Sequence, residues 1–245
     1  MLVDLEIWLN HFEYHAQHPR SVPAGLPDVL RAQERRLIAS SIATFQLGEQ
    51  SEGGTLQRAA RRFAHRNQVP ALARIVDLFI REEQRHAALL REFMQDHAIP
   101  LKSRDWTDGA FRRVRRLAGL ELYLHVLISA ELVGNVYYRA LEAATGCQRL
   151  KVLCRTLVCD ELAHVGFESQ LLLQLRARWP APLRFAARVA HRLFFASTVC
   201  VVWLTQRGLL RHAGHSLRTF MRACLAQYAF YLEPAPATLP SASLE

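Results

Sequence analysis

The sequence contains little glycine and proline, and it lacks patterns typical of β-strands. Among 245 residues, 11 are glycine and 10 are proline. Alternating runs of β-branched residues and Asn-Gly hairpin turns are missing, so a sheet is not expected. Alanine, leucine, arginine, glutamate and glutamine are common, and these residues favour helices. The sequence therefore predicts an all-α protein.

The chain also lacks a cysteine framework. Its five cysteines are an odd number, and none of them forms a Cys-x-x-Cys pair. This argues against a disulfide scaffold and against a zinc site built from thiolates. We expect the cysteines to be reduced, small, buried residues in a cytoplasmic protein.

No long hydrophobic segment is present. The most apolar run, residues 193–204, has 12 residues, whereas a membrane-spanning helix needs about 20. The first residues include acidic side chains and have no uniform apolar core, so they do not resemble a secretory signal. We expect no membrane span and interpret the run as a buried helix, with shallow membrane contact left open.

Negative charge is scarce relative to positive charge. The formal net charge is +9, and a basic surface can meet nucleic acid, an anionic membrane or an acidic protein. The arginines are spread along helix-like segments such as residues 58–62 and 112–116. We interpret them first as a solvated face.

Proline and glycine divide the chain into long helical segments within one domain, residues 1–232. The segments expected to be helical are 3–18, 28–66, 70 to just before Pro100, 108–145, 148–178, 182–212 and 215–232. Residues 233–245 are rich in proline and serine, which predicts a flexible tail.

The connections between these segments predict a topology. Short turns at 67–69 and 146–147 join two pairs of helices as antiparallel neighbours. The ten residues 98–107 can reach about 33 Å when extended, which is about the length of a 22-residue helix. Two hairpins joined by one long crossover predict a ferritin-like four-helix bundle over residues 28–178, with the remaining N- and C-terminal helices as additions.

An acidic residue and a histidine interrupt the apolar stripe of the segment after Pro70. The stripe advances in steps of three and four residues and contains Leu72, Ile75, Phe79, Leu90 and Phe93. Between Phe79 and Leu90 the same steps fall on Glu83 and His86. The segment 148–178 repeats the Glu-x-x-His spacing with Glu161 and His164.

The two remaining long helices each place one glutamate on their stripe, Glu49 and Glu131. Burying four unpaired carboxylates is prohibitive, and a buried ion-pair network is costly to desolvate. Two divalent cations balance the four charges, and carboxylate and imidazole are suitable ligands. One Glu from each of two helices, with Glu-x-x-His from the other two, is the arrangement of dinuclear carboxylate sites.

Residues 35–175 resemble the ferritin-like di-iron carboxylate superfamily in the segments FQLGEQSEG, EEQRH, ISAELVGNVYY and DELAH. The resemblance implies that Glu83 and Glu161 bridge two metal ions. The full ligand set that it implies is Glu49, Glu83, His86, Glu131, Glu161 and His164. Glu82 and Asp160 resemble the family's acidic residue that orients a ligand histidine of the opposite helix; the alternative is a solvated charge.

One position in the first long helix stays open. Glu49 and Glu52 lie three residues apart, and both fall on the stripe. The GEQS segment resembles the ligand region of rubrerythrin-like proteins, which favours Glu49. Glu52 is then a neighbour of the ligands, an alternative ligand, or the partner of a buried arginine.

The resemblance implies a non-haem iron enzyme. Two ferrous ions can supply two electrons to O2, so we expect an oxidoreductase that hydroxylates, desaturates or otherwise oxygenates an organic substrate. Two Fe ions, Mn/Fe or Mn/Mn all suit six N/O ligands. The basic charge favours an acidic electron donor such as a ferredoxin, and the helices after residue 180 fit a monomeric or homodimeric enzyme.

Three alternatives remain. A ferroxidase or rubrerythrin-like peroxidase is the first, although the rubredoxin Cys-x-x-Cys module is missing. A tRNA-modifying di-iron hydroxylase is the second. The third is a metal-stabilised binding or scaffold protein without activity. N-oxygenases of the superfamily carry an extra histidine where this chain has Leu157, which disfavours that reaction.

Overall fold

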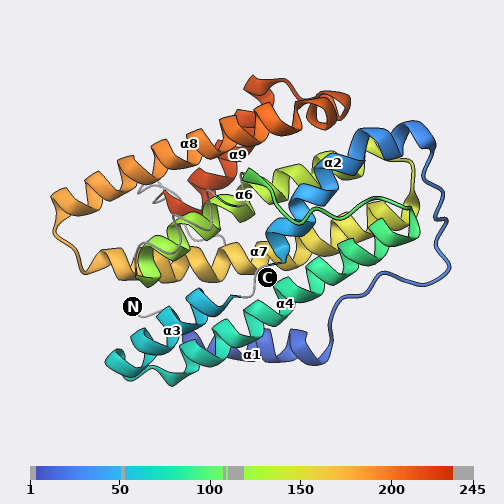
Figure 1. The fold of residues 1–245 in the computed structure, drawn as a ribbon. Coiled ribbons are helices and arrows are strands. Elements are labelled where there is room, and N and C mark those ends of the chain that lie inside the picture. The colour runs from blue at the N-terminus through green and yellow to red at the C-terminus, as the bar shows by residue number, and fades with distance from the viewer. Residues whose placement is uncertain (1–3, 51–52, 107–108, 110–118, 234–245) are drawn as a thin grey trace, which may run out of the picture.

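The protein is built from helices, as the sequence predicts (Figure 1). The computed structural model describes residues 4–50, 53–106, 109 and 119–233, and no strand occurs among them. The helices are α1 (Leu5–Gln17), α2 (Ala32–Glu49), α3 (Gly54–Asn67), α4 (Pro70–Asp96), α6 (Leu120–Ala144), α7 (Gln148–Ala177), α8 (Ala181–His212) and α9 (Leu217–Leu232).

The prediction of one helix over residues 28–66 is wrong, because α2 ends at Glu49 and α3 begins at Gly54. Gly53 adopts a left-handed conformation with φ of 63°, which ends regular α-helix and favours glycine. A Cβ atom at this position would lie 2.6 Å from the side chain of Ile80. The backbone of Gly53 therefore packs closely on α4 directly before α3 begins.

Helix α6 lies at the centre of the molecule. Its buried residues occur on all of its faces, which is typical of a helix surrounded by protein. It packs against α7 on one side and against α8 and α9 on another (Figure 1). Helix α4 packs against α1, α2, α3 and α7, so the middle of the molecule is enclosed by α2, α4, α6 and α7.

The other predicted boundaries agree with the described part of the chain. Pro70 begins α4 and Gln148 begins α7, and the segments expected at 3–18, 182–212 and 215–232 correspond to α1, α8 and α9. The third predicted helix, 108–145, is described only from Leu120 onward; Asp108, residues 110–118 and the tail 234–245 lie outside the described residues. Cys159 is exposed, so the expectation that every cysteine is buried is wrong.

Helix α8 is longer and more apolar than its uninterrupted run of 12 residues suggests. Among the described residues it is the helix that is long and apolar enough to cross a membrane, with a mean hydropathy of 1.5 over 18 residues. Only 39% of that window is buried within the protein. The core helix of a soluble protein can have the same length and composition.

Candidate metal centre

The six predicted ligands come together from four helices. Glu49 is the last residue of α2, and α6 contributes Glu131. Their donor atoms form two overlapping groups, and within each group the atoms lie within 4.8 Å of one another. The first group is Glu49, Glu83, His86 and Glu161, and the second is Glu83, Glu131, Glu161 and His164. Glu83 and Glu161 belong to both groups, so they lie between the two candidate metal positions.

Both histidines turn the same ring nitrogen toward this centre. Nδ1 of His86 lies 3.1 Å from Oε1 of Glu161, and Nδ1 of His164 lies 3.0 Å from Oε1 of Glu83. Both rings are fully buried. The Nε2 atoms are therefore free to hydrogen-bond groups outside the cluster.

The atoms that face one another across the centre have no hydrogen-bond partner outside this group of buried carboxylates and histidines. These buried atoms are Oε1 of Glu83, Nδ1 of His86, both carboxylate oxygens of Glu131 and of Glu161, and Nδ1 of His164. Buried polar groups in proteins are nearly always paired. Two overlapping groups of carboxylate oxygens and imidazole nitrogens, each with its donor atoms within 4.8 Å of one another, fit two divalent cations in number and in chemistry.

Burial and mutual repulsion control the protonation of these groups. Burial raises the pKa of Glu49 and of Glu131 well above the usual range, and neighbouring carboxylates raise it further. Burial opposes ionisation of Glu83 as well, but contacts with both histidines lower its pKa overall. The metal-free centre therefore holds protons, which an incoming metal ion has to displace.

For the two histidines, the attraction of the carboxylates outweighs the effect of burial on the pKa. Burial lowers the pKa of a histidine, but the surrounding carboxylates more than offset this and raise the pKa of His86 and of His164 well above the usual value. Two protonated histidines can neutralise two carboxylates in the metal-free protein. The remaining carboxyl groups then stay protonated, as their raised pKa values indicate.

A fifth carboxylate, Glu168, was missed by the sequence analysis. Its side chain is only 1% exposed, and it lies on α7 four residues after His164. Burial raises its pKa, and its charge in turn raises the pKa of Glu131. Glu168 follows Glu161 and His164 in steps of three and four residues, so the periodicity of the apolar stripe could have identified it as a buried residue.

Glu82 and Asp160 lie behind the histidines. Nε2 of His164 donates to Oε2 of Glu82 over 3.1 Å, and Nε2 of His86 donates to Oδ2 of Asp160 over 3.0 Å. Each acid thus bonds a histidine of the opposite helix, which is the pairing that the family resemblance implied. Such a bond fixes the tautomer that leaves Nδ1 free to bind metal.

Arginines compensate these two acids but not the centre itself. Arg20 forms an ion pair with Asp160, and Arg85 bonds both Asp160 and Glu82 at 2.5 and 3.2 Å. Burial opposes ionisation of Asp160, but His86 and the arginines lower its pKa. Among the described residues, no lysine or arginine forms an ion pair with Glu49, Glu83, Glu131, Glu161 or Glu168.

Substituting Glu82 with glutamine tests the supporting role of these acids. We expect Glu82→Gln to weaken metal binding by about 10- to 100-fold, because the charged oxygen that accepts from His164 is replaced by a neutral amide group, which holds the imidazole less firmly. Titration of metal-free protein with Mn(II) against a competing chelator measures the change. Glu92→Gln on the exposed side of α4, where Glu92 pairs with Arg149, is the control. Equal affinities of the two variants would contradict the assignment.

Helix α2 reaches the centre through Glu49 alone in the described structure. Tyr138 donates its hydroxyl hydrogen to Oε1 of Glu49 over 2.5 Å, which holds this carboxylate beside Glu83 and Glu161. Glu52 lies outside the described residues. Of the two candidate ligands Glu49 and Glu52, the described structure therefore gives geometric support to Glu49.

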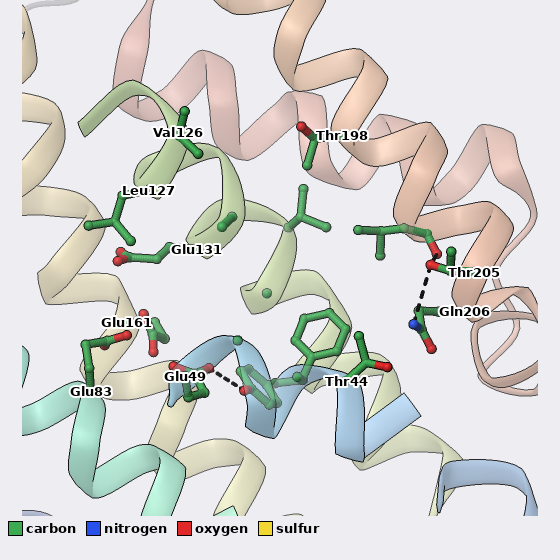
Figure 2. Close-up of a pocket in the computed structure, with 17 residues that line it drawn as sticks. Thr44, Glu49, Glu83, Val126, Leu127, Glu131, Glu161, Thr198, Thr205 and Gln206 are labelled. Atoms are coloured by element: carbon green, nitrogen blue, oxygen red, sulfur yellow. Dashed lines mark hydrogen bonds between the residues drawn. The ribbon is translucent and has the colours of Figure 1, made fainter. Parts of the chain in front are cut away.

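A cavity opens beside the carboxylates, with a volume of about 150 Å³. Its wall includes Glu49, Glu83, Glu131 and Glu161, and apolar side chains of α2, α6 and α8 line most of the rest. Figure 2 shows the glutamates on one side of the space and Thr205 and Gln206 of α8 on the opposite side. The candidate metal centre therefore borders a largely apolar chamber.

Comparison of the chain with models of known protein families, with curated protein sequences and with solved structures found no match.

Proposed function

We propose that this chain is a ferritin-like protein that holds two metal ions between α2, α4, α6 and α7 and uses them to oxidise an organic substrate with O2. Glu49 and His86 serve one metal position, Glu131 and His164 serve the other, and Glu83 and Glu161 reach both. The observation that carries the proposal is the set of buried, mutually facing oxygen and nitrogen atoms that have no hydrogen-bond partner outside the group.

The ferritin-like part of the proposal rests on helix order and placement. The α6–α7 pair is antiparallel and tightly joined, and α4 leads to α6 across a long connection (Figure 1). Dinuclear carboxylate bundles take single glutamates from two helices and Glu-x-x-His from the other two. Here α2 and α6 provide the single glutamates, and α4 and α7 provide the pairs. This is an argument by analogy of fold and ligand order.

An iron pair held in this position would supply electrons to O2. The chain's own residues would position the substrate, exclude water from the site and hold protons at defined atoms. Val126, Leu127 and Val133 line the cavity from α6 and exclude water from the reacting atoms. Tyr138 keeps its proton, because burial raises its pKa well above the usual value, so it donates steadily to Glu49.

The cavity favours a mainly apolar substrate with one polar group. Apolar side chains dominate its wall, whereas Thr198, Thr205 and Gln206 of α8 offer hydrogen bonds away from the glutamates. A substrate whose polar group meets these residues would direct its apolar part toward the metal centre. A storage function does not call for such a chamber, because Fe(II) ions are small and charged.

The experiment that tests the function begins with anaerobic loading of metal-free protein with Fe(II), followed by O2. We expect the Mössbauer spectrum of a coupled dinuclear site and, with excess reductant, O2 consumption that continues after the Fe(II) has reacted once. A spectrum of isolated iron only would contradict the metal pair. O2 uptake that stops when Fe(II) is exhausted, with formation of mineral iron, would favour a ferroxidase instead.

The cavity can be tested independently of turnover. Gly134 lines it, and a Cβ atom there has only a ring carbon of Tyr138 nearby, at 4.0 Å. We expect Gly134→Leu to fill the chamber and weaken binding of fluorobenzene by about tenfold or more, because a cavity of this size accommodates one aromatic ring. Fluorine NMR measures the binding.

The control for the cavity is Gly208→Leu, since Gly208 lies on an exposed part of α8 with open space around it. Metal content should be the same in wild type and both variants. If Gly134→Leu binds fluorobenzene as the wild type does, the cavity is not the binding chamber.

A further inference from the structure

The C-terminal helices carry most of the protein's excess positive charge. Residues 181–232 contain seven arginines and no aspartate or glutamate, whereas the remaining sequence contains 24 cationic and 22 acidic side chains. Arg192 pairs with Glu233 at 3.1 Å. The other six arginines of this segment form no ion pair with a described acidic residue. A local surplus of this kind attracts anionic partners.

Large apolar side chains project from the same region into solvent. Leu193 and Leu204 are each 65% exposed and Phe185 is 62% exposed, and Val189 is also exposed. At 3.6 residues per turn, these side chains and Arg192, Arg207 and Arg211 fall within an arc of about 120° on α8. We call this combination the α8 outer face. In Figure 1, α8 lies on the outside of the molecule, at the far side from α1.

We propose that the α8 outer face docks the protein onto the surface of an anionic membrane. A helix that lies in the interface buries apolar side chains at the boundary between headgroups and acyl chains, while its cations meet anionic headgroups. Leu193, Leu204 and Phe185 supply the apolar contacts, and Arg192, Arg207 and Arg211 supply the cations. Nucleic acid would satisfy the arginines but leave the leucines in water.

The placement of α8 favours contact with the surface over a membrane span. The stretch between Arg192 and Arg207 is about 22 Å long, which is shorter than the hydrocarbon core of about 30 Å. The opposite side of α8 is occupied, because His191, Phe195 and Val199 are buried against the protein. Thr198 and Gln206 line the cavity from that side. Docking therefore brings the cavity next to the bilayer without removing α8 from the bundle.

Co-sedimentation of the full-length, metal-free protein with lipid vesicles tests the proposal. We expect binding to phosphatidylcholine vesicles that contain about one third phosphatidylglycerol, and little binding to pure phosphatidylcholine. High salt should weaken the binding. Because no metal is needed, this result is independent of the proposed oxidoreductase function. Equal, salt-independent binding to both vesicles, or no binding to either, would overturn the proposal.

Two double variants separate the contributions of charge and of apolar contact. Arg207→Gln with Arg211→Gln should reduce vesicle binding by about thirtyfold. Leu193→Gln with Leu204→Gln should reduce it by about tenfold or more. The control is Ile7→Gln with Val29→Gln, which changes exposed apolar residues outside α8 and should leave binding unchanged. Circular dichroism checks that all three are folded.

Two other partners give distinguishable results. If wild type is a dimer in light scattering and Leu193→Gln with Leu204→Gln is a monomer, the α8 outer face is a subunit interface and the proposal fails. If tRNA binds tightly and displaces the protein from vesicles, while the leucine variant keeps both affinities, the face is a nucleic-acid site and the proposal also fails.

Discussion

Glu161→Gln is expected to remove the metal pair while leaving the protein folded. Glu161 is 2% exposed, and its two oxygens lie near His86 on one side and His164 on the other. Glutamine keeps the volume but replaces a charged oxygen with an amide NH2, which cannot bind a cation. Because this carboxylate belongs to both groups of donor atoms, its loss should weaken both metal positions, by about a hundredfold or more.

Metal analysis after anaerobic Fe(II) loading and gel filtration measures this result. The matched control is Glu142→Gln on α6, because Glu142 is outside the cluster and pairs with Arg155 at 2.6 Å. His86→Ala and His164→Ala should each reduce the metal content as well. If Glu161→Gln or both histidine variants retain the full wild-type content, the ligand assignment is wrong.

The sequence predicted the centre best where the spacing of two residues along one helix is enough to place their side chains close together. Glu83 and His86, like Glu161 and His164, share a helix face through i, i+3 spacing, and the structure places these four residues in two overlapping groups that share Glu83 and Glu161. Their recognition needed no tertiary detail, because charged residues on an apolar stripe must face a common interior. Glu49 and Glu131 followed from the same reasoning.

The spacing of residues along a helix does not predict contacts between segments that are far apart in the sequence. The close approach of the Gly53 backbone to Ile80 of α4 is a tertiary contact, although the Gly53-Gly54 pair is itself a local signal for a helix break. Arg20 approaches Asp160 from the segment after α1, 140 residues away in sequence. Glu168 is a different case, because it lies on the same apolar stripe as Glu161 and His164, so spacing alone is enough to predict its burial beside them.

Because Glu168 adds a fifth buried carboxyl group to the centre, we predict that the carboxyl groups which favour metal binding lower the stability of the metal-free protein. The double variant Glu131→Gln, Glu168→Gln should stabilise the metal-free protein by about 1–3 kcal/mol, which corresponds to a rise in melting temperature of about 5 °C. Both carboxyl groups are buried with raised pKa values. Folding at neutral pH therefore forces them to take up protons, whereas glutamine needs none.

The sign of the pH dependence follows from these shifts. A carboxyl group whose pKa is raised on folding destabilises the folded state as the pH rises above the unfolded value of 4.5. The stability difference between double variant and wild type should therefore be small below that pH and grow toward neutrality. Asp160→Asn is the control with the opposite sign, because contacts lower the pKa of Asp160 on folding, so its loss should destabilise the protein at neutral pH.

Adding metal should reverse the order of stability. At a thousandfold excess over the dissociation constant, a bound ion stabilises the folded state by about 4 kcal/mol, so Mn(II) should raise the melting temperature of the wild type by about 10 °C. The double variant lacks Glu131 as a ligand and should respond weakly. Differential scanning calorimetry with and without Mn(II) measures both states. A variant that is more stable than wild type in both conditions would contradict a metal centre, because a purely structural cluster has no reason to retain carboxylates that cost stability and bind nothing.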